Sequence, residues 1–181
     1  MSSSNLIRVG GLAAMVGSAL YALQSLLWPS YRENVFFYFL LLGGLAAIAA
    51  IAALAVLEGE RWKLAWTLVA SLVAFVGITL MLVYELFRLA EQEPQKISVV
   101  VTVLFVGLFV GTLGLLALGI LVMVLGVLPW WGGAALIAGS PLSAFFLRLL
   151  ELSLPGVVWV VVGYAIFRAA GRRTKGPPRV Q

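Results

Sequence analysis

The side chains that could do chemistry in this chain are few, and they fall at two places with matching spacing. Glu85 and Arg88 stand three residues apart, and Arg148 and Glu151 repeat that spacing, so each pair shares one face of a helix. Gln24 adds an uncharged polar group. Ionisable groups inside a membrane span are costly and usually functional, so these five residues form a candidate polar or transport site.

The depth of this polar site in a membrane decides between two interpretations. Counting about 20 residues from Trp62 places Glu85 near the far headgroups and not at the midplane. Glutamate and arginine at that depth can extend to water. We therefore favour interfacial ion pairs, and a substrate or proton site is the alternative.

Several residue types that catalysis requires are missing. The chain has no histidine and no cysteine, and each of its seven acidic residues is a glutamate. Serine–histidine catalysis and histidine ligation of haem or zinc are therefore excluded. Gly139-Ser140-Pro141 resembles a nucleophile turn, but no general base accompanies it, and no glycine-rich phosphate loop occurs. We predict no enzyme activity, no catalytic residue, no cofactor and no metal.

Small residues recur at helical spacing in two segments. Gly10, Ala14 and Gly17 lie in the first apolar segment, and Gly107 and Gly111 form a GxxxG pair in the fourth. Small faces let helix backbones approach closely in lipid, where packing replaces the hydrophobic drive. The two possible uses are packing inside one bundle, which we favour, and an oligomer interface.

Basic residues concentrate at the C-terminal end of the chain. Such a cluster next to a membrane helix can bind anionic lipid, at about 1 kcal/mol for each basic residue. The alternative is that the cluster only determines topology. Although the pI is near 10.0, no basic and aromatic groove pattern indicates nucleic acid. The candidate lipid-contact residues are Arg168, Arg172, Arg173, Lys175 and Arg179.

The composition indicates that transmembrane helices hold the polar and basic side chains in place. Of the 181 residues, 63% are hydrophobic and 10% are charged, whereas soluble domains carry about 45–50% and about 25%. We predict an all-α, polytopic transmembrane helical bundle over residues 1–170 and a basic, disordered cytoplasmic tail over 171–181. The expected spanning helices, about six, cover residues 6–28, 35–57, 62–89, 97–128, 134–150 and 154–170.

Three segments leave alternatives open. Arg8 before an apolar run resembles a signal peptide, but the run reaches Trp28, so a retained first helix is favoured. The fourth segment would be roughly 48 Å long and must tilt, bend or protrude. Pro141 either kinks the fifth helix or breaks it into a re-entrant segment, and five spans are the main alternative to six. A turn is expected over 129–133.

The distribution of lysine and arginine predicts the orientation. With six spans, both termini lie on the side that receives more of the basic residues, so both termini are expected in the cytoplasm and the chain in the bacterial inner (plasma) membrane. That side holds Arg8, Arg61, Lys63, Arg168, Arg172, Arg173, Lys175 and Arg179, and the other side holds Arg32, Arg88, Lys96 and Arg148.

Two functions are consistent with these features. The first is a non-enzymatic structural, accessory or subunit protein, because polar residues are scarce within the spans and small-residue faces are common. The alternative is a small transporter or channel whose polar site lies near the outer ends of the third and fifth helices. The expected partners are the lipid bilayer and other membrane subunits or a second copy of the chain, with no nucleic acid.

Overall fold

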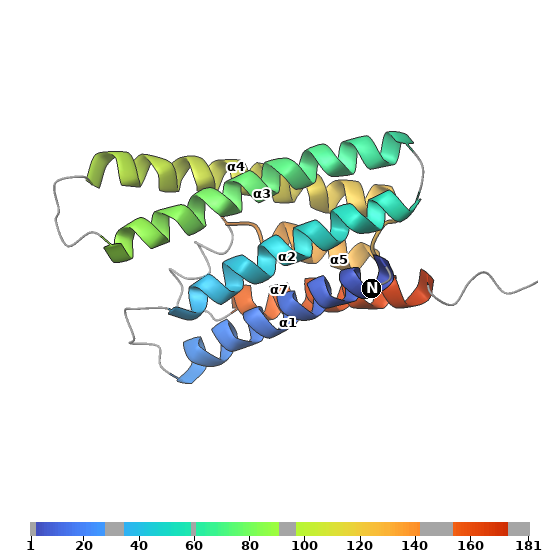
Figure 1. The fold of residues 1–181 in the computed structure, drawn as a ribbon, viewed down its shortest axis with the longest axis horizontal. Coiled ribbons are helices and arrows are strands. Elements are labelled where there is room, and N and C mark those ends of the chain that lie inside the picture. The colour runs from blue at the N-terminus through green and yellow to red at the C-terminus, as the bar shows by residue number, and fades with distance from the viewer. Residues whose placement is uncertain (1–2, 28–34, 59–60, 91–96, 142–153, 174–181) are drawn as a thin grey trace, which may run out of the picture.

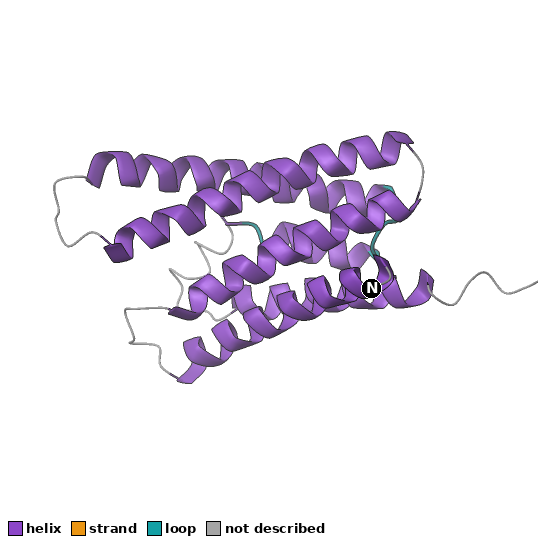
Figure 2. Ribbon diagram, in the orientation of Figure 1, coloured by secondary structure: helices purple, strands orange, loops and turns teal. Residues whose placement is uncertain are grey.

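The computed structural model describes residues 3–27, 35–58, 61–90, 97–141 and 154–173. Every secondary-structure element in these ranges is a helix, and no strand occurs in them (Figure 2). In chain order the helices are α1 (Ser3–Leu27), α2 (Val35–Glu58), α3 (Arg61–Ala90), α4 (Ile97–Val124), α5 (Trp130–Ala138) and α7 (Leu154–Arg173).

The helices form a closed ring in two layers (Figure 1). Helices α1, α2 and α3 lie side by side in one layer, and α4, α5 and α7 lie behind them. Each helix contacts the next along the chain, α7 returns to pack on α1, and α2 also contacts α7. The chain ends therefore meet, and α2 lies close to the centre of the bundle.

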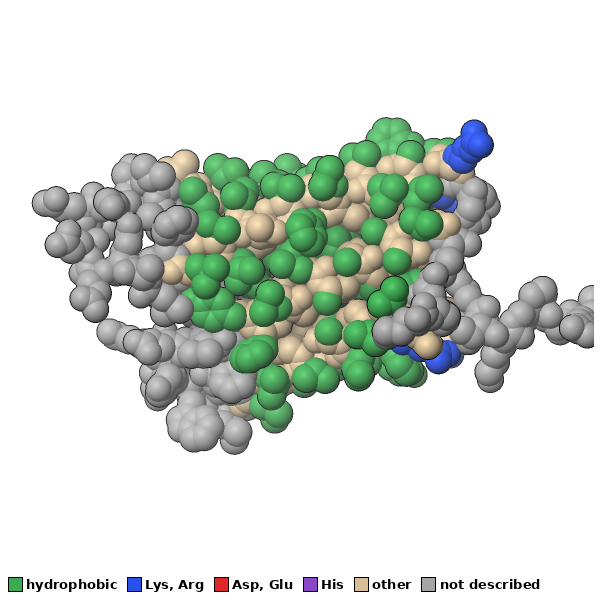
Figure 3. Space-filling model, in the orientation of Figure 1, with side chains coloured by type: hydrophobic (Ala, Val, Ile, Leu, Met, Phe, Trp, Pro, Cys, Tyr) green, Lys and Arg blue, Asp and Glu red, His purple; other side chains and the backbone are tan. Residues whose placement is uncertain are grey.

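Four of the described helices are long and apolar enough to cross a membrane. The apolar stretches run over Asn5–Leu23, Tyr38–Val56, Arg61–Tyr84 and Thr102–Val124. The outward faces of these helices carry large apolar side chains, such as Leu72 and Leu113, each 64% exposed (Figure 3). Lipid is the solvent that suits such a surface, so the prediction of a helical membrane protein is confirmed.

The fifth helix differs from the prediction. Helix α5 has nine residues, about 14 Å of helix, and ends at Ala138, well before the end of the predicted segment over 134–150. The N–H of Gly139 donates to the Ala135 carbonyl at 2.8 Å, and the N–H of Ser140 donates to the Ile137 carbonyl at 3.2 Å. The helix is therefore interrupted at Gly139 and Ser140, and the chain is helical again at Pro141, because the first turn of a helix tolerates the missing N–H of proline. Residues 142–153 lie outside the described part of the chain.

The turn before α5 also lies earlier than expected, and residues 129–133 do not form it. Helix α4 ends at Val124 and not at 128, which leaves about 42 Å of helix. Gly126 has φ +71°, and its N–H donates to the Met123 carbonyl at 3.3 Å. Glycine adopts this left-handed conformation at helix ends because it has no Cβ. Helix α5 therefore begins at Trp130, and α7 extends to Arg173, three residues past its predicted end.

Close contacts between the layers are made at glycines. A Cβ placed on Gly77 of α3 would collide with the backbone of Gly111 on α4. A Cβ placed on Gly163 of α7 would lie 2.6 Å from the carbonyl oxygen of Gly11 on α1. Both pairs of helices can approach this closely only because neither side has a side chain at the crossing point.

This packing predicts opposite effects for two glycine-to-alanine changes. Gly77→Ala should lower stability by about 1–3 kcal/mol, because the new methyl meets backbone that cannot move aside. Gly44→Ala is the matched control, since its methyl would lie 3.5 Å from Cδ1 of Ile78, an ordinary contact. It should leave stability unchanged or raise it by up to about 1 kcal/mol, because alanine favours helix.

Thermal unfolding of both purified variants in the same detergent measures the difference. Equal melting temperatures for Gly77→Ala and the wild type would show that the α3–α4 crossing is not tightly packed.

Candidate functional site

The residues predicted as a polar site are distributed over two described helices and one segment outside them. Gln24 lies in α1, and Glu85 and Arg88 lie in α3, but their side chains are outside the described part of the structure. Arg148 and Glu151 fall in 142–153, also outside it. The proposed gathering of these five side chains therefore stays a prediction.

The break after α5 is irregular backbone that is buried inside the described bundle. Trp159 of α7 is 4% exposed, and its indole N–H donates to the Gly139 carbonyl oxygen at 3.0 Å. On the other side, a Cβ on Gly111 would lie 3.1 Å from Cγ of Pro141. Gly111 lies near the middle of α4, so the break sits at mid-depth between α4 and α7.

The groups at this break are dipoles and not charges. A helix end leaves carbonyl groups without partners inside the helix, and the Trp159 indole satisfies the one on Gly139. Ser140 in the break and Thr112 on α4 are both buried. Carbonyl and hydroxyl groups can orient a hydrogen-bonding solute or coordinate a cation weakly, but they cannot supply general acid–base catalysis at neutral pH.

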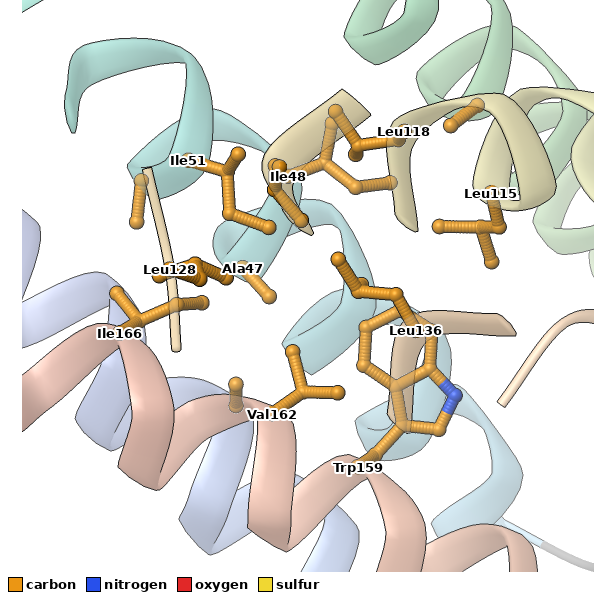
Figure 4. Close-up of a cluster of buried hydrophobic side chains, with 14 of the residues drawn as sticks. Ala47, Ile48, Ile51, Leu115, Leu118, Leu128, Leu136, Trp159, Val162 and Ile166 are labelled. Carbon is orange, nitrogen blue, oxygen red and sulfur yellow. The ribbon is translucent and has the colours of Figure 1, made fainter. Parts of the chain in front are cut away.

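Buried apolar side chains form a cluster that includes Trp159 (Figure 4). The six-membered ring of the Trp159 indole points into this cluster. The other members of the cluster include side chains of α2, α4, α5 and α7. The centre of the described bundle is thus a packed core. Its fully buried members include Ile48, Ile51, Leu115, Leu118, Leu136 and Val162.

Three buried serine and threonine residues were not among the predicted site residues, and half-buried Thr79 adds a fourth buried hydroxyl oxygen. Thr67 and Ser71 are four residues apart on α3, and Ser18 lies on α1; none of their oxygens has a hydrogen-bond partner among the described residues. A buried hydroxyl without a partner costs about 1–3 kcal/mol. The four-residue spacing of Thr67 and Ser71 was visible in the sequence. Ser18 does not join them in one site, because α2 lies between α1 and α3.

The small residues face neighbouring helices of the same chain. Gly10, Ala14 and Gly17 of α1 face α2, and Gly107 and Gly111 of α4 face α3. Ala14 is completely buried. These residues are therefore occupied by packing within the bundle, and an oligomer interface would have to use other surfaces.

The basic side chains that the structure describes lie at one end of the bundle, where α1 and α3 begin and α7 ends (Figure 3). The Arg8 guanidinium lies over the Phe167 ring, 5.8 Å from its centroid, which connects α1 to α7. Arg168 and Arg172 are exposed on α7. The Arg173 side chain and residues 174–181, with Lys175 and Arg179, are outside the described part.

The Trp159 hydrogen bond generates a prediction about stability. Trp159→Phe keeps an aromatic ring in the core but leaves the buried Gly139 carbonyl without its donor, which should cost about 1–3 kcal/mol. Trp130→Phe, at a position that is 74% exposed, is the matched control and should have little effect. Chemical unfolding in detergent compares the two, and an unchanged Trp159→Phe midpoint would show that the bond does not hold the break.

Comparison with known proteins adds no relative to this description. No protein family, no curated protein and no solved structure matches the chain. The chain is a helical membrane protein, and four of its described helices are long and apolar enough to span the bilayer.

Proposed function

We propose that the chain is a non-enzymatic membrane protein that acts as a structural, accessory or subunit component, through its outer surface. The observation that carries this proposal is the packed core around Trp159 (Figure 4). Interlocked leucine, isoleucine and valine side chains between α2, α4, α5 and α7 leave little room for a solute. A bundle with such a centre contributes through what it contacts and not through what passes along it.

The residue types available support the non-enzymatic part of the proposal. The whole chain lacks histidine, cysteine and aspartate. The buried polar side chains of the described residues are hydroxyls, such as Thr67 and Ser71. A hydroxyl becomes a nucleophile only beside a base, which the neighbouring apolar side chains do not provide.

Site-specific photo-crosslinking in cell membranes tests the proposed role. A photoreactive residue replaces, one at a time, an exposed side chain of α1, α3, α4 or α7: Leu12, Leu72, Leu113 or Val157. We expect at least one position to form a discrete adduct with a membrane protein or a second copy of the chain. Leu115, fully buried and two residues from Leu113, is the matched control and should form none. A chain that forms no adduct from any of the four positions and purifies as a monomer would contradict the proposal.

A small transporter or channel is the second candidate, and the break after α5 favours it. Discontinuous helices at mid-depth commonly form the binding sites of transporters, because their free backbone groups face the substrate. Gly139 and Ser140 have this position in the bundle, although the Trp159 indole engages the Gly139 carbonyl. The predicted polar site near the outer ends of α3 and the segment after Pro141 would then lie on the path to it.

The orientation proposed for either function places the basic end of the bundle in the cytoplasm. Arg61 and Lys63 at the start of α3 and Arg168 and Arg172 near the end of α7 support this orientation, since cytoplasmic ends carry an excess of basic residues. Exposed Trp62 and Trp66 at the same end suit the headgroup level. The membrane proposed is the bacterial inner membrane.

Single cysteines can test the transport path and the orientation together, because the chain has no cysteine of its own. The leading proposal predicts that Ser140→Cys does not react with a small, charged thiol reagent, while Trp62→Cys, 60% exposed, reacts only from the cytoplasmic side. Reaction at Ser140→Cys, with the buried control Leu115→Cys unreactive, would contradict the packed core and support the transporter. Reaction of Trp62→Cys from outside intact cells would reverse the orientation.

A further inference from the structure

We infer that the basic end of α7, together with the start of α5, forms a binding site for one anionic phospholipid. The site consists of Tyr164, Arg168 and Arg172 on α7 and Trp131 on α5. It belongs to the helical bundle and is distinct from the tail that follows Arg173. It would operate whether the chain is an accessory protein or a transporter.

The first support is the order of side chains along the exposed face of α7. Val157, Val161, Tyr164, Arg168 and Arg172 are spaced three or four residues apart, so they share one face, and all five are exposed. The face changes from aliphatic to aromatic to cationic toward the end of the helix. A phospholipid has the complementary order, with acyl chains, then the glycerol region, then the phosphate.

The lengths agree with one leaflet. Val157 and Arg168 are eleven residues apart in the sequence, which is about 16 Å along a helix. One leaflet supplies about 15 Å of the hydrocarbon core. A lipid whose chains lie along the valines therefore has its phosphate at the level of Arg168.

The aromatic part of the site is held by a contact between helices. The rings of Trp131 and Tyr164 stack with centroids 6.0 Å apart and an interplanar angle of 23°. A Cβ on Gly132 would lie 2.8 Å from Cβ of Ala165, so the start of α5 is pressed against α7. Aromatic rings of this kind prefer the headgroup level. The stacked rings of Trp131 and Tyr164 therefore line the site one helical turn before Arg168.

The charge distribution selects an anionic headgroup. Residues 152–181 contain five basic residues and no acidic one, namely Arg168, Arg172, Arg173, Lys175 and Arg179. The segment between α2 and α3 has no such excess of positive charge, because Glu58 and Glu60 stand beside Arg61 and Lys63 in the sequence. Arginine is suited to phosphate because its planar guanidinium can donate two parallel hydrogen bonds.

Native mass spectrometry of the full chain with added lipid tests this site. In a mild detergent, the wild type should retain phosphatidylglycerol in preference to phosphatidylcholine, with one tightly held copy. The double variant Arg168→Ala/Arg172→Ala should weaken that binding about 25-fold, from about fivefold for each basic residue. Arg61→Ala/Lys63→Ala is the charge-matched control and should retain the lipid, as should a chain lacking residues 174–181.

Two results would overturn the inference. One is equal retention of phosphatidylglycerol and phosphatidylcholine by the wild type. The other is loss of phosphatidylglycerol on removal of residues 174–181 with full retention by the double variant, which would assign the binding to the tail. Circular dichroism and melting temperature establish that each variant is folded. Excess inorganic phosphate should fail to displace the lipid, because the acyl chains contribute to the binding.

Discussion

Close approach of helix backbones at glycine is the constraint on which this bundle depends. In lipid, association of helices gains little from the hydrophobic effect, so contact between surfaces must supply it. Gly77 against Gly111 and Gly11 against Gly163 bring α3 to α4 and α1 to α7. Because the two contacts join the layers at opposite sides of the bundle, they enclose α2 and α5 between them.

The broken helix is tolerated because of this enclosure. Free backbone groups cannot face hydrocarbon, so a helix can end at mid-depth only where protein supplies partners. Pro141 and the turn at Gly139 lie between Gly111 of α4 and the Trp159 indole of α7, which donates to the buried Gly139 carbonyl. Leucine and isoleucine side chains of the core pack around Trp159. The same arrangement that permits the break therefore also closes the space around it.

Structure and charge divide the molecule into an apolar interior and a polar end. The interior of the described bundle holds apolar side chains and a few hydroxyls, and the basic side chains that the structure describes lie where α1 and α3 begin and α7 ends. The end combines arginines with exposed or stacked aromatic rings from α3, α5 and α7. This division is the physical reason to seek the role of the chain at its surfaces, with lipid and with other membrane chains.

Hydropathy alone determined the helical class and the positions of the four long apolar helices, because a run of apolar residues is a local property that lipid selects directly. The extent of α5 could not be predicted: apolar residues continue on both sides of Pro141, and only the Trp159 bond and the packing against Gly111 make a break tolerable there. Likewise the spacing of Gly10, Ala14 and Gly17 showed a packing face but not its partner. Only the tertiary structure showed that α2 packs against this face of α1, because contacts between separate helices depend on the whole bundle.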